Sequence, residues 1–92
     1  MTFFSSIPFK IVLMPSPVDK DEKEDLIILG ERIKSIRTQK GLSLEQVAQR
    51  VSKDRQSVHK LEKGNFNPSY LYLKKICTGL EITLTQLFED KA

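Results

Sequence analysis

The stretch SLEQVAQRVSKDRQSVHKLEKG, residues 43–64, decides the fold. Ser43 with Gln46 three residues later forms a capping box, which predicts a helix that begins directly after Ser43. Asp54 is a good N-cap for a second helix, and Gly64 predicts its end. Because the connection between the two helices is only about three residues long, they cannot lie antiparallel and must cross at a steep angle, as in a helix-turn-helix.

Apolar spacing divides both helices into an inner and an outer face. Val47, Ala48 and Val51 in the first helix, and Val58 and Leu61 in the second, recur with helical period and predict the buried side. The outer face of the second helix then carries hydrogen-bonding residues and almost no acids: Arg55, Gln56, Ser57, His59 and Lys60. Such residues can donate to guanine or pair with adenine in the major groove. An ordinary solvated helix face is the alternative interpretation.

Three further helices are predicted around this pair. One runs from Leu26 to the stop at Gly41, with Leu29, Ile33 and Ile36 on the same face as Leu26. Another follows Pro68 and carries an apolar face of Leu73, Ile76, Cys77 and Leu80. A second capping box, Thr83 with Gln86, begins a short helix whose expected inward residues are Leu84, Leu87 and Phe88. The prediction is an all-α, compact five-helix bundle over residues 26–90.

Residues 1–25 are expected to form a non-helical N-terminal extension. Segment 1–18 holds three of the four prolines, and FKIVLM at 9–14 has the composition of a short strand, although a lone strand has no partner. Segment 19–25, DKDEKED, has a net charge of −3 and is interpreted as an acidic hinge.

The net charge of +3 for all 92 residues conceals an uneven distribution. Residues 31–75 have a net charge of +7, and residues 81–91 have −2. A basic central region between acidic flanks is expected if this region touches a polyanion, but solvated lysine-rich surface explains it equally well.

Composition argues against several other classes of protein. With 39% hydrophobic residues in 92, the chain builds only a small core, which disfavours a large-pocket enzyme. The single Cys77 excludes an intrachain disulfide framework, and the single His59 leaves a metal or nucleophile site without further ligands. Neither a phosphate loop nor a membrane-spanning stretch is present. We therefore expect no enzyme activity, no cofactor, no metal and a cytoplasmic protein.

Residues 29–88 resemble the phage-repressor and Cro-like (Xre-type) helix-turn-helix family. The matching segments are LGERIKSIRTQKGLS at 29–43, LEQVAQRVSKDRQSVHKLEKGNFNPS at 44–69 and LKKICTGLEITLTQLF at 73–88. The resemblance implies a lambda-repressor-like DNA-binding bundle and a sequence-specific regulator of transcription, repressor-like and dimeric. The present sequence departs from the family pattern at Leu44, where a Gln is usual, at Ser52, where a Gly is usual, and at Lys53, where an apolar residue is usual.

The resemblance also implies roles for individual residues. Arg55, Gln56, Ser57 and Lys60 match positions that face base edges, and His59 matches one that reaches a base or a phosphate. The positions that match ones near the DNA backbone are Ser43, Lys63, Asn65 and Asn67. Lys40 is expected to join them as a phosphate contact if the protein binds DNA. Arg37 and Glu62 match a structural ion pair.

Two functions are compared. The first is binding of double-stranded DNA by a homodimer that reads a palindromic operator with two half-sites about one helical turn apart. The second is an antitoxin or adaptor-type interaction module, in which segment 1–18 captures a protein partner and DNA binding is secondary. The apolar stretch in this segment either adds as a strand to the sheet edge of a partner or pairs with its own copy across a dimer axis.

Overall fold

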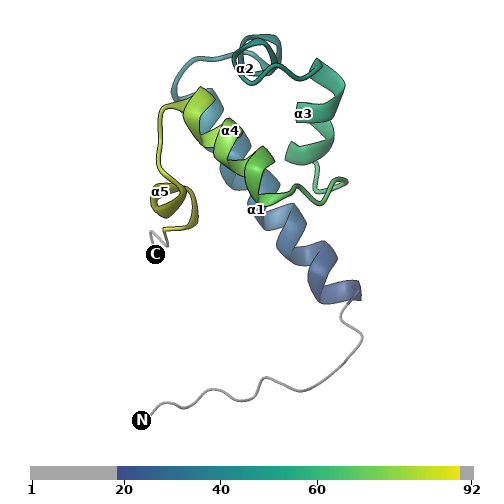
Figure 1. The fold of residues 1–92 in the computed structure, drawn as a ribbon. Coiled ribbons are helices and arrows are strands. Elements are labelled where there is room, and N and C mark those ends of the chain that lie inside the picture. The colour runs from purple at the N-terminus through teal and green to yellow at the C-terminus, as the bar shows by residue number, and fades with distance from the viewer. Residues whose placement is uncertain (1–18, 90–92) are drawn as a thin grey trace.

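The computed structural model describes residues 19–89, which form five helices and no strand. These are α1 (Asp19–Gln39), α2 (Leu44–Arg50), α3 (Arg55–Glu62), α4 (Tyr70–Leu80) and α5 (Leu84–Phe88). In Figure 1, α4 is seen in front of α1, α2 and α3 lie together at one end, and α5 lies at the side. The prediction of an all-α bundle of five helices is confirmed.

Side-chain caps begin each of the four shorter helices. The Ser43 hydroxyl accepts from the Gln46 amide at 3.0 Å, while the Gln46 side chain accepts from the Ser43 amide at 2.8 Å. Thr83 and Gln86 form the same reciprocal capping box at α5. Asp54 caps α3 and Ser69 caps α4. Both capping boxes and the Asp54 cap were predicted, since these residues satisfy backbone donors that the first turn leaves unpaired.

The start of α1 differs from the prediction. The helix begins at Asp19 rather than Leu26, so the acidic segment 19–25 forms its first two turns and is not a hinge. Acidic residues are favourable at a helix N-terminus. In addition, Lys23 Nζ donates to the Gly64 carbonyl at 2.8 Å and to Asn65 Oδ1 at 2.6 Å, which ties this part of α1 to the chain after α3. Segment 1–18 and its predicted short strand lie outside the described residues.

The core lies largely where the periodicity placed it, but Leu26 is only half-buried and is not among the side chains packed against the core. The most completely buried side chains of the core come from all five helices: Ile33, Val47, Val58, Leu61, Ile76, Leu80 and Leu87. Phe88 was expected to close the core, but its side chain is 53% exposed because Leu87 occupies the inward position of α5. Tyr72, which was not among the residues expected in the core, is buried.

Gly30 brings the backbones of α1 and α3 together. A Cβ atom at Gly30 would lie 2.5 Å from the Leu61 carbonyl oxygen and closer still to that of Glu62. Any larger residue would therefore force the end of α3 away from α1. This contact fixes the position of the helix whose outer face carries the predicted base readers.

Candidate nucleic-acid interface

The turn between α2 and α3 closes through the backbone. Lys53 N–H donates to the Ala48 carbonyl at 2.9 Å, and Ala48 itself is buried. Ser52 adopts a left-handed conformation, with φ at 59°, where the resembling family usually has glycine. The serine in this turn is therefore mildly strained, because a side chain disfavours this backbone region.

The α3 residues predicted to face bases lie mainly on one exposed surface. Arg55, Gln56, His59 and Lys60 are exposed, whereas Val58 and Leu61 on the opposite side are buried. Ser57 is different, because it is half-buried and its hydroxyl is hydrogen-bonded to the Tyr72 hydroxyl. Four of the five residues are thus free to meet a ligand, and the fifth already has a partner inside the protein.

The residues predicted to contact phosphates flank α2 and α3. Lys40 and Ser43 lie just before α2, and Lys63, Asn65 and Asn67 follow α3. All five are exposed. Their contact with phosphate stays a prediction. Asn65 also accepts a hydrogen bond from Lys23, so its side-chain amide oxygen already has a donor within the protein.

Arg37 and Glu62 form the predicted ion pair. Arg37 Nε donates to Glu62 Oε2 at 2.6 Å and Arg37 Nη2 to Glu62 Oε1 at 3.0 Å, while the third nitrogen, Nη1, donates to the Leu42 carbonyl at 2.8 Å. Both residues are buried. A two-point pair of this kind is geometrically specific, so it holds the C-terminal end of α3 against α1 and the loop before α2.

Tyr72 is the residue at this surface that was missed. Its ring packs edge-on against Phe66, with the centroids 5.0 Å apart, and Lys53 Nζ lies 5.2 Å from its centroid. The signal was available in the sequence, since Tyr72 precedes Ile76 and Leu80 at four-residue spacing on the inner face of α4.

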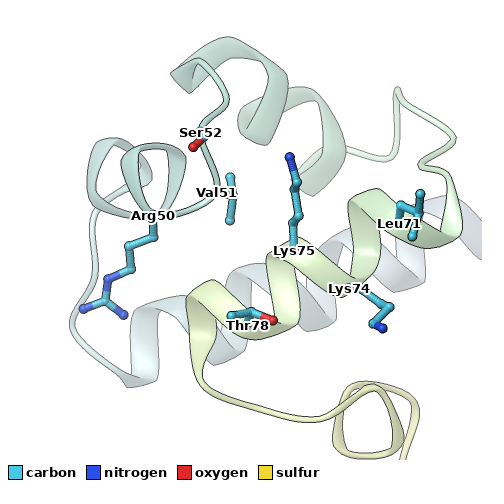
Figure 2. Close-up of a pocket in the computed structure, with 7 residues that line it drawn as sticks. All are labelled: Arg50, Val51, Ser52, Leu71, Lys74, Lys75 and Thr78. Atoms are coloured by element: carbon cyan, nitrogen blue, oxygen red, sulfur yellow. The ribbon is translucent and has the colours of Figure 1, made fainter.

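A hollow of about 410 Å³ lies between the end of α2, the turn and α4, and its charged side chains are all cations. Figure 2 shows Lys75 extending from α4 toward the turn, with Arg50 and Lys74 further out. Arg50 Nη1 donates to the Gly79 carbonyl at 2.8 Å. The seven lining residues include neither a carboxylate nor a histidine or cysteine to act as an acid–base pair: Arg50, Val51, Ser52, Leu71, Lys74, Lys75 and Thr78.

The two potentially reactive side chains singled out in the sequence, Cys77 and His59, lie in different environments. Cys77 is buried in the core, and burial raises the pKa of its thiol, so the reactive thiolate is disfavoured. His59 is exposed on α3. Within residues 19–89, no three His, Cys, Asp or Glu side chains are grouped so that they could hold a metal ion. None of the helices in that range is both long and apolar enough to cross a bilayer.

Comparison with known proteins identifies the family. The model of a family described as "Helix-turn-helix domain" matches residues 30–92. The control protein C.MunI of a Mycoplasma species is 40% identical over 65 residues, covering 70% of this chain and 88% of that protein. The restriction-modification controller protein C.AhdI of Aeromonas hydrophila has a similar crystal structure, with a TM-score of 0.69 and 38% identity over 71% of this chain and 98% of that one. The controller protein C.Esp1396I, solved as a tetramer with its natural 35-base-pair operator, gives a TM-score of 0.66 at 31% identity, over 70% and 84% of the two chains. The chain therefore belongs to the helix-turn-helix family that its sequence resembles, the Xre-type regulators.

Proposed function

We propose that this protein is a transcriptional regulator that binds double-stranded DNA in a sequence-specific manner through the major groove. One observation carries the proposal: α3 presents Arg55, Gln56, His59 and Lys60 on an exposed face that has no acid, while its opposite face is buried. A short polar helix held in this way matches the dimensions and the donor and acceptor pattern of the major groove.

The rest of the fold supplies rigidity to this helix. Asp54 caps its N-terminus, the buried Arg37–Glu62 pair holds its C-terminal end, and Gly30 allows α1 to approach it closely. Base readout requires side chains held at fixed positions relative to the groove, so a rigid supporting structure favours specificity. We assign base contacts to the exposed α3 residues and phosphate contacts to Lys40, Ser43, Lys63, Asn65 and Asn67, which would set the register on the duplex.

The proposed active form is a homodimer on a palindromic operator. The related controller protein C.Esp1396I, which forms a tetramer on a 35-base-pair operator, supports an oligomer on DNA. Two copies of α3 would then read half-sites about one helical turn apart. In this proposal the protein acts by binding alone, as a repressor-like regulator in the cytoplasm, and it needs neither a cofactor nor an enzymatic step.

The interaction-module hypothesis is not favoured. It depends on segment 1–18, which lies outside the described residues. The helix-turn-helix family model and the related control protein C.MunI instead support DNA binding. A further protein partner of segment 1–18 stays a prediction that is independent of DNA binding.

Selection of bound sites from random duplex DNA tests the proposed function. We expect a palindromic consensus, because two identical α3 helices related by a two-fold axis read inverted half-sites. A matched control is the variant Arg55→Ala/Gln56→Ala/Lys60→Ala, which changes only exposed residues of α3 and leaves the core and the ion pair intact. Recovery of no consensus with the parent protein, or of the same consensus with the variant, would overturn the assignment.

A further inference from the structure

Tyr72 contacts three segments at or beside the proposed DNA-binding surface: the turn before α3, α3 itself and the loop after it. Its hydroxyl is hydrogen-bonded to Ser57 of α3. Its ring packs against Phe66, which lies in the loop between Asn65 and Asn67, and it lies under the ammonium group of Lys53 in the turn. Tyr72 itself belongs to α4 and is only 8% exposed, so it joins the turn, the helix and the loop from the inside of the molecule.

Ser57, which is hydrogen-bonded to the Tyr72 hydroxyl, is held at both its backbone and its side chain. Its amide donates to Asp54 Oδ1 at 2.8 Å as part of the N-cap of α3. Its hydroxyl is engaged with Tyr72, and the residue is half-buried. A serine hydroxyl can donate one hydrogen bond and accept two, and either hydroxyl can be the donor between Ser57 and Tyr72. If Ser57 turned away from Tyr72 to read a base edge, the buried tyrosine hydroxyl would lose this partner, which is unfavourable.

The same geometry gives a reason for the unusual Lys53. The family resemblance leads one to expect an apolar residue there, yet the Lys53 ammonium lies 5.2 Å from the Tyr72 ring centroid, within the range of a cation–π interaction. The lysine therefore packs against the protein through the same tyrosine that holds Ser57.

We propose that Ser57 and Tyr72 form a positioning pair that sets the orientation of α3 relative to the turn and the loop, and so determines sequence specificity without contacting a base. This inference rests on the proposed function, because it concerns how the same surface reads DNA. Arg55, Gln56, His59 and Lys60 remain the readers, and the pair fixes the position from which they read.

The substitution Tyr72→Phe tests the pair most directly. It removes only the hydroxyl and retains the ring that packs against Phe66 and Lys53. We expect the ratio of affinities for the selected site and for random duplex to fall about three- to tenfold, as expected for loss of one hydrogen bond that acts in the specific complex. Affinity for random duplex should change little, because phosphate contacts supply it.

The matched control is Tyr70→Phe. Tyr70 lies two residues earlier on α4 and is exposed, so loss of its hydroxyl should leave the affinity ratio unchanged. Ser57→Ala should lower the ratio as much as Tyr72→Phe, and the double variant should bind within about twofold of either single variant, since both substitutions remove one interaction. Thermal unfolding of every variant, with binding measured well below the transition, separates positioning from a loss of folded protein.

Three outcomes would overturn the positioning pair. The first is a Tyr72→Phe variant that keeps the full affinity ratio. The second is a Ser57→Ala variant that loses preference at a single base position while Tyr72→Phe does not, which would make Ser57 a base reader. The third is a lowered unfolding temperature in both variants with an unchanged ratio, which would make the contact merely structural. Absence of any sequence preference in the parent protein is a distinguishable result, because it would overturn the proposed function itself.

Discussion

Arg55 is the first residue of α3 and lies exposed on the outer face of the helix. We predict that Arg55→Ala weakens binding to the preferred operator by about 1–3 kcal/mol and relaxes the preference at one base position in each half-site, because a guanidinium can form two hydrogen bonds with one guanine. Competition titrations with operators altered at single positions measure both effects. A variant that binds specific and random duplexes as the parent does would contradict the role of Arg55.

Ser52 carries a backbone cost that glycine would relieve. A left-handed conformation such as its φ of 59° costs an ordinary residue about 1–2 kcal/mol, of which the greater flexibility of glycine in the unfolded chain offsets a part. We predict that Ser52→Gly stabilises the domain by about 1 kcal/mol and raises the melting temperature by several degrees, measured by thermal unfolding.

Gln49→Gly is the control for this prediction. Gln49 is exposed and helical in α2, so glycine there should destabilise the protein by about 1 kcal/mol. If both glycine variants were destabilised alike, the Ser52 backbone would not be strained.

The contact of α1 with α3 depends on a missing side chain at Gly30. Alanine is the better helix former by about 1 kcal/mol, but its Cβ would overlap the Leu61 and Glu62 carbonyl oxygens, and overpacking of this kind costs about 1–3 kcal/mol. We predict that Gly30→Ala is destabilised in urea unfolding and loses operator specificity, because α3 is displaced.

Gly41→Ala provides the comparison for Gly30. A Cβ at Gly41 meets no atom within 4 Å, although φ there is 71°. The Gly41 variant should therefore lose stability through its backbone alone and keep the specificity of the parent. Equal specificity in the Gly30 and Gly41 variants would show that α3 does not move.

The ion pair that joins the same two helices should show strong coupling. The Arg37 and Glu62 side chains are 11% and 3% exposed, so Arg37→Met leaves a buried carboxylate without its partner. We predict a loss of about 3 kcal/mol for Arg37→Met, and a smaller loss for Arg37→Met/Glu62→Leu, because the double variant leaves no buried charge unpaired. Urea unfolding of both variants measures this. A double variant destabilised at least as much as Arg37→Met would contradict the coupling of the two side chains.

The elements that the sequence could predict are those controlled by neighbours in the chain. Ser43 with Gln46, and Thr83 with Gln86, specify helix starts within four residues, and the structure contains both capping boxes. The beginning of α1 was not predictable in this way, because an acidic run suits either a hinge or a helix N-terminus. In the structure, Lys23 within this run donates hydrogen bonds to Gly64 and Asn65. This is a tertiary contact between segments about forty residues apart, which local sequence does not reveal.

In the candidate site, too, local spacing predicted some features, whereas others depend on tertiary packing. Helical period predicted which face of α3 is exposed, but not that Ser57 at the edge of that face bonds to Tyr72, since that depends on how α4 packs. Phe88 was placed in the core because a five-residue helix shows too little of its period to fix its inward face. The Arg37–Glu62 pair followed only from the family resemblance, since no local spacing links these residues.

At the scale of the whole molecule, the basic charge is concentrated in the part of the sequence that contains α2 and α3. The net charge of +7 over residues 31–75 lies between the acidic first turns of α1 and an acidic C-terminal segment. Binding that releases counterions from phosphates weakens linearly with the logarithm of salt concentration, with a slope of about −0.9 for each phosphate neutralised. Lys40 and Lys63 of two protomers would give a slope of about −3.6 on this basis.

We predict that Lys63→Ala reduces that slope by about one unit for each protomer and weakens binding to specific and random duplexes alike, because Lys63 is exposed after α3 and is assigned to phosphate. Titrations on both duplexes at several salt concentrations measure the slope. Lys34→Ala is the matched control, since it removes one exposed cation from α1 outside the assigned set and should leave the slope unchanged. Equal slope changes in the two variants would mean that DNA responds to the total charge of the protein, whereas a change confined to Lys63 places the phosphate backbone beside the end of α3.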